Sequence, residues 1–498
     1  MSDNSLRSIA IVGGGVAGWM AAAVLSRILR GKTAVTLFEG AAADSALPAE
    51  IGTLPALRGF HDLRLGIDEA DLLRKTGGTF RLGTWFDDWS AKGASYFHPL
   101  GEIGANMNGI AFRHHWLKLR EVGTLDAFAD FSVAGMAARA GKFTRPSPDK
   151  RSVLSTLDYG YHLDLERYCA YLRDLAVSNG VLRRERQVAG ARQHGEDGSI
   201  AALVLDDGSE AEADFFIDCT GILIGDTLKS GFEDWSDWLP CDRMISATSP
   251  GAVDLPPYTR ATAHAAGWRW RTPLQDRSGN GIAYSSAHMS EDEALAILRK
   301  SDGSGEPRRT SFRSERRKIF RDRNVVALGP AAGALEPLEG ASLHMIQVGI
   351  SRLAEIFPGR DPSAIEAAED NRVVASEFER LRDFLILHYK ATRRDDSAFW
   401  NHCRTMAVPE PLERKIEQFQ SRGRFVLYDE ETFAESSWTA VMIGQGVIPA
   451  RTDPILDSFP IEQLRQQAQR MHSIIGQGAD SMPPHRVFLE KYCGAKAR

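Results

Sequence analysis

The pattern of apolar and polar positions is most regular at the start of the chain. The apolar run at residues 9–12 (IAIV) predicts a buried strand, and the alanine-rich stretch after the glycines predicts a helix. A second apolar run, at residues 34–39 (AVTLFE), predicts another strand that ends in an acidic residue. Strand, glycine turn, helix and strand in this order predict a βαβ unit with two parallel strands.

Three glycines between the first predicted strand and helix have the spacing Gly13-x-Gly15-x-x-Gly18. In a dinucleotide-binding fold the first glycine allows a tight turn, the second lets the pyrophosphate approach the backbone, and the third lets the helix pack on its strand. The helix then points its N-terminus at the phosphates, and Val16, between the second and third glycines, is assigned to the cofactor site together with them. Glu39 comes 21 residues after Gly18, where a carboxylate can bond a ribose hydroxyl. The motif alone leaves NAD and FAD open.

Later apolar runs favour one of these two cofactors. Residues 213–221 (ADFFIDCTG) and 324–340 (NVVALGPAAGALEPLEG) each contain an apolar run that ends at glycine, and each predicts a further strand. Strands that return to the nucleotide fold after long insertions are typical of a two-part flavoprotein, whereas a compact NAD domain usually lacks them. FAD is therefore the predicted cofactor.

The length of the chain, 498 residues, allows two or three packed subregions. The predicted fold class is α/β, with a Rossmann-like FAD-binding module of the flavin-monooxygenase type, an interleaved substrate part and a helical C-terminal region. The FAD-binding module is predicted to be discontinuous, at residues 1–55, 155–225 and 310–355. The substrate part is predicted at residues 56–154 and 226–309, and the helical region at residues 356–498.

Composition and charge narrow the class of function. With 43% hydrophobic and 25% charged residues, a formal net charge of -6 and no long basic run, the chain is not predicted to bind nucleic acid. No stretch is long and apolar enough to predict a membrane span. The five cysteines form no C-x-x-C pair and the thirteen histidines show no metal-ligand spacing, so no metal site is predicted. These features favour a cytoplasmic protein that acts on a small molecule.

A charged residue interrupts the apolar stretch at residues 77–86 (GGTFRLGTWF). Taken as one strand, this stretch would put Arg81 on the same face as Trp85, with apolar residues on both faces. A guanidinium stays charged and is costly to bury unless it has a partner or a task. The sequence therefore marks Arg81 as a candidate functional residue.

Two motifs that contain tryptophan resemble those of the flavin-dependent tryptophan halogenases. Trp19 directly follows the last glycine of the nucleotide motif, as in that family. The stretch GWRWRTP is similar to the family's W-x-W-x-I-P signature and matches it through Trp268, Trp270 and Pro273, with Thr272 in place of the isoleucine. The tryptophans also have a structural interpretation, in which they fill the core between the flavin and substrate parts and block the substrate access that monooxygenases use.

Further stretches extend this resemblance over nearly the whole chain. Residues 336–342 (EPLEGAS) are similar to the family's E-P-L-E-S-T-G, and residues 161–168 and 381–400 resemble helices of the family. The resemblance implies a two-component system in which a separate flavin reductase supplies reduced FAD. Reduced FAD, oxygen and chloride or bromide then yield hypohalous acid, which reaches an indole or another small aromatic substrate through a tunnel. The resemblance leaves undecided whether the protein forms a homodimer.

The resemblance also assigns residues to FAD beyond the nucleotide motif. Residues 47–53 (LPAEIGT) correspond to a family segment beside the flavin that reads G-x-G-E-A-T. Ile51 stands where that segment has its acid, and Glu50 comes one residue earlier. The further FAD contacts that the resemblance implies are Ala49, Val188, Gly329, Pro330 and Leu343.

The family's catalytic lysine lies in a strand that reads T-F-K-x-G, and this pattern falls on residues 79–83. Arg81 takes the position of the lysine, because the nearest lysine, Lys75, lies on the other side of two glycines. A lysine amine can lose a proton and take up the halogen, whereas an arginine stays charged and can orient an oxygen anion or a carboxylate. The resemblance implies Glu339 as the catalytic partner of Arg81. A buried ion pair with a structural role is the alternative.

Halide and substrate positions are implied by the same resemblance. The family's halide-binding threonine and glycine correspond to Ala341 and Ser342, and Ser342 adds a Cβ where the glycine leaves room. Phe97 and His98 match the stretch that stacks on the indole, and Trp438 is placed to close the substrate pocket. Each of these three aromatic residues has an alternative role in the core.

Three functions fit these residues. The first is a FAD-dependent, halogenase-like oxidoreductase that uses reduced flavin, oxygen and halide to halogenate an indole or another aromatic substrate. The second is a flavin-dependent monooxygenase that acts on an aromatic substrate without halide. The third is a non-catalytic flavin-binding protein. The sequence favours the first and selects neither the substrate nor the position that is modified.

Overall fold

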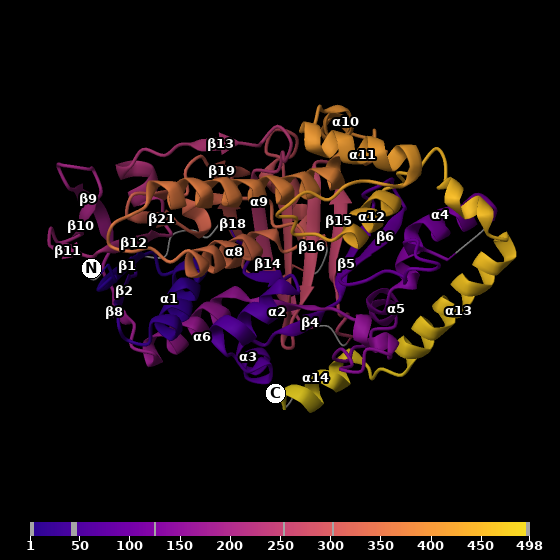
Figure 1. The fold of residues 1–498 in the computed structure, drawn as a ribbon, viewed down its shortest axis with the longest axis horizontal. Helices are drawn as coiled ribbons and strands as arrows, with labels where there is room; N and C mark the ends of the chain where they lie inside the picture. The colour runs from indigo at the N-terminus through magenta and orange to yellow at the C-terminus, as the bar shows by residue number, and fades with distance from the viewer. Residues whose placement is uncertain (1–3, 41–46, 124–125, 252–253, 301–302, 495–498) are drawn as a thin grey trace.

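The computed structural model describes residues 4–40, 47–123, 126–251, 254–300 and 303–494. It confirms the predicted α/β class, with strands and helices mixed through the first part of the chain and helices alone in the last part. Figure 1 shows the long helices α8 (Ala341–Glu355) and α9 (Ala364–Lys390) lying across the strands.

The first large sheet contains the predicted βαβ unit. Its six strands have the order β20-β21-β12-β1-β2-β8, and β1 is parallel to both β2 and β12. These strands are β1 (Ser8–Val12), β2 (Ala34–Phe38), β8 (Leu182–Arg184), β12 (Phe215–Asp218), β20 (Arg321–Asp322) and β21 (Val325–Ala327). Each of the four apolar runs that predicted strands supplies one of them. Helix α1 (Val16–Leu29) connects β1 to β2 and packs on α6 (Leu165–Ser178).

The second large sheet has the order β18-β14-β17-β16-β15-β5-β6. Its neighbours pair antiparallel, apart from the parallel pair β5 and β15. The strands are β5 (Gly83–Asp87), β6 (Ser95–Pro99), β14 (Arg243–Pro250), β15 (Thr259–His264), β16 (Gly267–Pro273), β17 (Arg277–Tyr284) and β18 (Arg308–Ser311). The W-x-W stretch forms the whole of β16, near the middle of this sheet.

Three small sheets complete the strand content of the described residues. The one that matters most for the site has the order β3-β7-β4, with β3 (Glu50–Gly52), β7 (Gly160–Asp164) and β4 (Thr79–Arg81). The others are β11-β10-β9 and β13-β19-β22, with β9 (Val188–Gln193), β10 (Ile200–Leu205), β11 (Glu210–Glu212), β13 (Phe232–Asp234), β19 (Glu315–Arg317) and β22 (Gly333–Ala334). Strand β3 packs against β16 and β17, so the small β3-β7-β4 sheet joins the large one.

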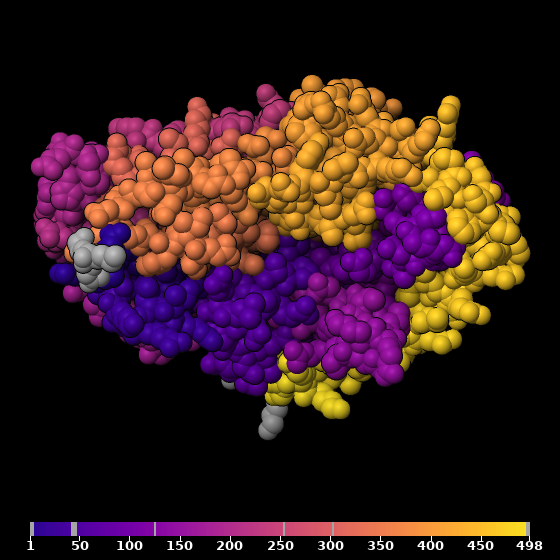
Figure 2. Space-filling view, viewed as in Figure 1, coloured from indigo at the N-terminus to yellow at the C-terminus, as the bar shows by residue number. Residues whose placement is uncertain are grey.

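Helices cover the sheets and close the far end of the molecule. Those of the first part are α2 (Ala56–Phe60), α3 (Glu69–Thr76), α4 (Phe112–Glu121), α5 (Val133–Arg139) and α7 (Glu291–Lys300), with short turns η1 (His61–Leu65), η2 (Phe128–Phe131), η3 (Val153–Thr156), η4 (Ile222–Thr227) and η5 (Gly329–Ala331). A further short turn, η6 (Pro454–Ser458), lies in the last part of the chain. The predicted helical C-terminal region contains α9, α10 (Ala398–Thr405), α11 (Glu410–Arg422), α12 (Glu435–Gly444), α13 (Ile461–Asp480) and α14 (His485–Cys493). Figure 2 shows the yellow last part of this region, which contains α13, wrapping the right-hand end of the molecule, and α14 returns to α3.

The division into a FAD-binding module, a substrate part and a helical region stays a prediction at the level of its residue boundaries. All six strands of the first large sheet come from segments assigned to the FAD-binding module. Its predicted first segment, residues 1–55, includes residues 1–3 and 41–46, which lie outside the described part of the chain.

Two predictions of local structure are wrong. Residues 77–86 are not one strand, because the chain passes from β4 in the small sheet to β5 in the large one at Leu82, whose N–H donates to the carbonyl of Pro257 at 2.6 Å. The predicted alternation of faces therefore breaks between Arg81 and Gly83. The stretches at residues 161–168 and 381–400 are also not single helices, since the first begins in β7 and the second crosses the turn between α9 and α10.

Candidate functional site

The carboxylate of Glu339 is the centre of a buried polar cluster. Arg81 donates from Nη2 to its Oε2 at 2.8 Å, and the hydroxyl of Thr84 donates to the same oxygen at 2.8 Å. His98 Nδ1 lies 2.7 Å from Oε1, and His388 Nε2 lies 3.6 Å from it. The side chains of Arg81 and Glu339 are 1% and 0% exposed. The predicted pair of Arg81 and Glu339 is thus in contact, out of reach of water.

Each of these residues comes from a different element. Arg81 ends β4, Thr84 lies in β5, His98 in β6 and His388 near the end of α9. Glu339 stands in the loop before α8 with a φ of 59°, a left-handed conformation that is uncommon for a residue with a side chain. Such a conformation costs about 1–2 kcal/mol, which the four contacts of the carboxylate offset.

The groups around Glu339 keep its carboxylate ionised. Burial by itself would raise the pKa of Glu339, but His98, His388 and the Arg81 guanidinium hold that pKa well below its usual range. Burial lowers the pKa of Arg81 from its ordinary value, and the attraction of Glu339 opposes this change. Because arginine starts so far above neutral pH, the pair is an ion pair under physiological conditions.

Within the part of the chain that the structure describes, the guanidinium of Arg81 is hydrogen-bonded at Nη1 and Nη2 but not at Nε. Nη1 donates to the carbonyl of Thr53 at 2.8 Å, and Nη2 also lies 2.6 Å from the hydroxyl of Thr84. Nε is buried and has no hydrogen-bond partner among the described residues. A Cβ on Gly52 would come within 2.9 Å of both Nε and Cδ, so the glycine leaves the room that this side chain needs.

A small enclosed cavity of about 20 Å³ adjoins this side chain. The side chains that line it and matter here are Arg81, Thr84, Thr259, Trp268, Trp270 and Glu339. A cavity of this size holds one molecule about as large as water. The two tryptophans of the W-x-W stretch therefore form a wall of the space beside Arg81, and their ring centroids are 5.5 Å apart.

No sequence pattern predicted the residue that supports β4. The N–H of Phe80 donates to Nε2 of His485 at 3.2 Å, and Nδ1 of this histidine lies 2.8 Å from the carbonyl of Leu255. Burial lowers the pKa of His485 to about 4, so at neutral pH the ring is uncharged and can accept at Nε2 while it donates from Nδ1. His485, the first residue of α14, thus accepts the hydrogen bond of a backbone N–H in β4, the strand that carries Arg81.

A second buried acid, Glu336, is hydrogen-bonded to Trp268, one of the two tryptophans that form this wall. Glu336 accepts hydrogen bonds from the indole N–H of Trp268 at 3.3 Å, from the hydroxyl of Tyr389 at 2.5 Å and from the N–H of Cys241 at 3.1 Å. Burial raises the pKa of Glu336 from 4.5 to about 7, against the effect of these donors. No cation is recorded beside it within the described part of the chain. Pro273, the last residue of the signature, accepts at its carbonyl from the hydroxyl of Thr79 in β4 at 2.7 Å.

This buried acid makes stability depend on pH. Between pH 4.5 and about 7 the folded protein keeps a proton on Glu336 that the unfolded chain has released, so stability falls as the pH rises through this window. Above about pH 7, ionised Glu336 lowers the free energy of unfolding by about 3 kcal/mol relative to the protonated form. Glu336→Gln removes this titration. The unfolding free energy of the variant, relative to that of wild type, should therefore increase by about 3 kcal/mol between about pH 5 and about pH 8, as measured by urea unfolding. A constant difference over that range would mean that Glu336 is already ionised at the lower pH.

The glycines of the nucleotide motif adopt the conformation that the motif predicts. Gly13 has a φ of 113°, and a Cβ on Gly18 would come within 1.9 Å of the carbonyl oxygen of Gly13. Open space surrounds Gly15, and Val16 is the first residue of α1. This turn has the shape of a pyrophosphate site at a helix N-terminus.

Glu39 follows the last residue of β2, where the prediction placed it. Its carboxylate accepts from the indole N–H of Trp19 at 3.3 Å and from Nε of Arg183 at 2.6 Å. A ribose hydroxyl at this position would compete with one of these two donors. Trp19, the tryptophan after the last glycine, is fully buried and orients the acid.

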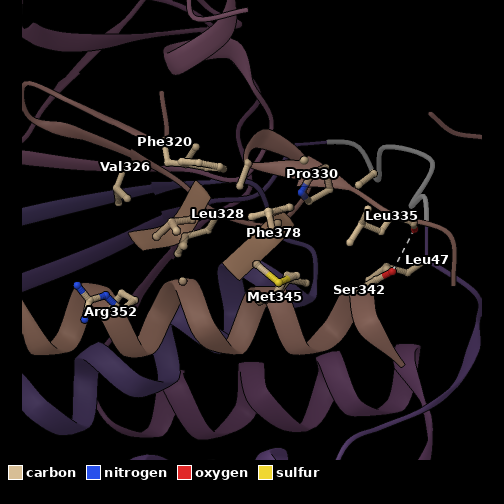
Figure 3. Close-up of a pocket in the computed structure, with 18 of the residues that line it drawn as sticks. Leu47, Phe320, Val326, Leu328, Pro330, Leu335, Ser342, Met345, Arg352 and Phe378 are labelled. Carbon is tan, nitrogen blue, oxygen red and sulfur yellow. Dashed lines mark hydrogen bonds between the residues drawn. The ribbon is translucent and has the colours of Figure 1, made fainter. Parts of the chain in front are cut away.

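The other predicted FAD contacts divide into two groups. Gly329 and Pro330 line an apolar cavity at the end of β21, together with Ser342, and Figure 3 shows this cavity above α8. Ala49, Val188 and Leu343 are not among its lining residues. Leu343 is 1% exposed in the core beneath α8, Val188 begins β9, and the carbonyl of Ala49 accepts from the N–H of Leu165 at 2.8 Å.

The same two chain segments line both the apolar cavity and the small cavity beside Arg81. Leu47 lines the first, whereas Pro48, Glu50, Ile51 and Gly52 line the second. Residues 335–342 likewise contribute to both, with Leu335 and Ser342 at the first and residues 337–340 at the second. Two segments that were singled out in the sequence therefore form the partition between the two cavities.

The predicted halide residues lie in the first turn of α8. The N–H of Ala341 donates to the carbonyl of Leu338 at 3.2 Å, and the hydroxyl of Ser342 donates to the carbonyl of Leu335 at 3.3 Å, drawn as a dashed line in Figure 3. The first turn of a helix favours an anion. The amide of Ala341 is nevertheless already in use, so a halide here would rely on the amides that follow it.

The predicted substrate residues are only partly brought together. His98 contacts Glu339, whereas the ring of Phe97 faces Trp85 and Tyr258, with centroids 5.7 Å and 6.0 Å away. Trp438 lies one layer further out. Its ring packs edge-on to Phe384, and Phe433 stacks on Phe384 at 3.8 Å and lies 6.0 Å from His98.

Sequence reasoning missed Thr84, His388, Glu336 and His485. Glu336 opens a motif that was singled out, and its burial could have been inferred from its apolar neighbours. His388 stands in the apolar stretch FLILHY, where a polar residue at a core position of a helix is a signal. No comparable signal marks Thr84 or His485.

The structure adds two findings about absent features. Among the described residues, no group of three or more histidine, cysteine or acidic side chains is placed to hold a metal ion. No helix in the same part of the chain combines the length and apolarity that crossing a bilayer requires.

Comparison with known proteins identifies the family. The model of the tryptophan halogenase family matches residues 8–461. The chain is 27% identical to tryptophan 6-halogenase ThaL from Streptomyces albogriseolus over 92% of this chain and 93% of the relative. Its structure matches that of BrvH, a flavin-dependent halogenase from Brevundimonas sp. BAL3, with a TM-score of 0.94 and 41% identity over 98% of this chain and all of the other.

A second solved structure agrees. Xcc4156, a flavin-dependent halogenase from Xanthomonas campestris, has a TM-score of 0.94 and 39% identity, over 99% of this chain and 100% of that one. The family match covers the nucleotide motif, the W-x-W strand and the loop of Glu339 in one alignment. The chain therefore belongs to the tryptophan halogenase family, a family of flavin-dependent halogenases.

Proposed function

We propose that this enzyme halogenates an indole or another small aromatic substrate, with chloride or bromide as the halogen source and with FAD that a separate flavin reductase has reduced. The observation that carries the proposal is the buried pair of Arg81 and Glu339 beside a cavity that holds one small molecule. Its tryptophan wall and the neighbouring apolar cavity support the same function, because two chain segments separate an apolar cavity from a space that holds one small molecule.

The residues at the nucleotide end fit FAD. The open space at Gly15 and the tight turn at Gly13 leave room for a pyrophosphate at the start of α1. The apolar cavity lined by Gly329 and Pro330 suits the edge of a flat ring system. When bound, reduced FAD supplies hypohalous acid from oxygen and halide. Contacts from Glu39, Ala49, Val188 and Leu343, and halide binding at Ala341 and Ser342, are part of this proposal.

Arg81 is proposed to hold the oxygen of hypohalous acid. Its free Nε–H can donate into the small cavity while Nη2 stays on Glu339. When a carbon of the aromatic ring attacks the halogen, the bond between oxygen and halogen breaks and the oxygen leaves as hydroxide. The fixed guanidinium stabilises that developing charge in a site without water. Arg81 thus positions the reagent and does not become halogenated itself.

His98 is proposed to take the proton that the ring loses. Its Nδ1 contacts Glu339, which leaves Nε2 buried and without a hydrogen-bond partner among the described residues. If Nδ1 carries the hydrogen, Nε2 can accept the ring proton, and Glu339 stabilises the imidazolium that forms. The proton then neutralises the hydroxide, so that the net products are the halogenated ring and water. Phe97, next to His98 in β6, and Trp438, which packs on Phe384, are proposed to border the bound substrate.

A screen of aromatic compounds with bromide, oxygen and a flavin reductase tests the proposal. We expect a product that carries one bromine in place of one hydrogen, identified by its isotope pattern in mass spectrometry. The control omits bromide and should give no product. The variant Trp270→Phe keeps an aromatic wall beside the cavity and should remain active.

A second candidate is oxygenation without halide. The observation that favours it is the amide of Ala341, which is bonded to Leu338 and not free for a halide. Product that gains an oxygen atom at the same rate with and without bromide would replace the halogenase proposal with this one. Absence of both products from a protein that binds FAD would instead favour a non-catalytic flavoprotein.

A further inference from the structure

An open groove lies on the surface between α4, the end of α11 and η6, away from the cluster around Glu339. Its volume is about 670 Å³, within the range of small-molecule sites. The lining residues that matter here are Arg113, His114, Arg422, Arg424, Phe425 and Ile455. Nothing in the halogenation chemistry above uses this groove.

The groove carries an excess of positive charge. Three arginines and one aspartate line it, which leaves a net charge of +2. Arg113 is engaged by Glu435 at 2.7 Å, and Arg424 is engaged by Asp453. Arg422 is exposed, and within the described part of the chain no hydrogen bond or ion pair holds it. One guanidinium is therefore available to a ligand.

A buried histidine adds an unused polar atom at the same place. His114 is 4% exposed, and its Nδ1 has no hydrogen-bond partner among the described residues. Burial, aided by the charge of Arg113, lowers the pKa of His114 to about 4, so the ring is neutral and Nδ1 can carry a hydrogen. Such an atom is normally paired, which points to a partner that binds here.

Gly423, at the end of α11, lets the helix end pack closely against α4, the helix that carries His114. Gly423 ends the helix with a φ of 69°, and a Cβ there would lie 3.9 Å from Nδ1 of His114. The turn places Arg422 and Arg424 on either side of the glycine. The other wall is apolar, with Val426 60% exposed and Ile455 50% exposed beside the ring of Phe425.

We propose that this groove binds a carboxylate on an aliphatic or aromatic body. The flat fork of Arg422 matches the two oxygens of a carboxylate, and His114 can donate to one of them. The apolar body then covers Val426 and Ile455, which are otherwise exposed to water. This site does not depend on whether the enzyme halogenates.

The groove is linked to the catalytic cluster by one short segment. Phe425 lines the groove and Phe433 packs near His98, both within the irregular chain between α11 and α12. Trp438 joins them, since its ring lies 6.4 Å from that of Phe425 and 5.1 Å from that of Phe384. A carboxylate in the groove would thus lie against the same packed segment as the catalytic cluster, whether it belongs to a substrate or to a separate ligand.

Calorimetric titration of the full-length protein with 4-phenylbutyrate tests the site. We expect saturable binding, and binding about tenfold weaker in Arg422→Gln because a charged hydrogen bond is lost. The matched control is Arg470→Gln, an exposed arginine on α13 that does not line the groove, and it should bind as wild type does. Thermal unfolding of each variant shows that the fold is kept.

Two further probes make the proposal falsifiable. The neutral 4-phenylbutyramide should bind much more weakly, and inorganic phosphate should bind more weakly than 4-phenylbutyrate because it leaves the apolar wall uncovered. Equal binding of acid and amide, equal binding of phosphate, or no effect of Arg422→Gln would each overturn it. To find the source of the carboxylate, the KM for an aromatic substrate with an acidic chain is compared with that for its amide. If Arg422→Gln raises the KM for the acid alone, the carboxylate belongs to the substrate. If the variant changes neither KM, the carboxylate belongs to a separate ligand.

Discussion

Glu339→Gln is expected to lower the rate of aromatic bromination by about 100-fold or more, because the variant removes the charge that fixes Arg81 and His98. It should also lower the free energy of unfolding by about 3–5 kcal/mol, since the buried guanidinium loses its counter-charge. The side chains of this pair are 1% and 0% exposed, so water cannot replace the lost partner. Single-turnover bromination and urea unfolding measure the two effects.

The matched control is Glu410→Gln, which breaks a surface ion pair with Arg414. Both side chains there are more than half exposed, and such a pair contributes about 0–1 kcal/mol. The control should therefore leave rate and stability near those of wild type. A Glu339→Gln protein that keeps its full bromination rate would show that this carboxylate holds the structure together and takes no part in the reaction.

Arg81→Lys is expected to raise halogenation by about tenfold or more, since a buried amine can lose its proton and take up the halogen or donate a tuned hydrogen bond. The lysine keeps a positive charge near Glu339 but loses the bond of Nη1 to the carbonyl of Thr53. A loss of about 1–2 kcal/mol in stability should accompany the gain in rate. Bromide-dependent product formation at equal flavin load measures the change, and Arg81→Met should abolish it.

Arg382→Lys serves as the control for this exchange. Arg382 is a buried arginine on α9 that bonds Asp383 and lies over the ring of Trp235, outside the site. Its replacement should cost stability without raising the rate. If Arg81→Lys also leaves the rate unchanged while FAD still binds, the limit on halogenation lies elsewhere, and the engaged amide of Ala341 is the first place to look.

Local pattern predicted the nucleotide end of the molecule well. β1, α1 and β2 are consecutive in the chain, and their glycines and apolar runs are determined by contacts within that unit. The contact of Arg81 with Glu339 was also predicted, although from a resemblance between motifs and not from periodicity. Family motifs carry information on long-range contacts that a single apolar pattern does not.

The rest of the cluster could not be read from the pattern for a physical reason. Glu339 is surrounded by side chains that lie 241 and 255 residues away in the sequence, at His98 and Thr84. The break at Leu82 likewise depends on pairing with the distant chain at Pro257, and its local sign is Gly83, an isolated glycine within an otherwise alternating stretch. Local propensity is overridden where two sheets compete for one stretch of chain.

The hydrogen bond from Phe80 to His485 joins residues 405 positions apart. During synthesis, β4 therefore leaves the ribosome long before the residue that completes its outer edge. A chain released before α14 would contain every strand of the first large sheet, while the strand of Arg81 would lack its last partner.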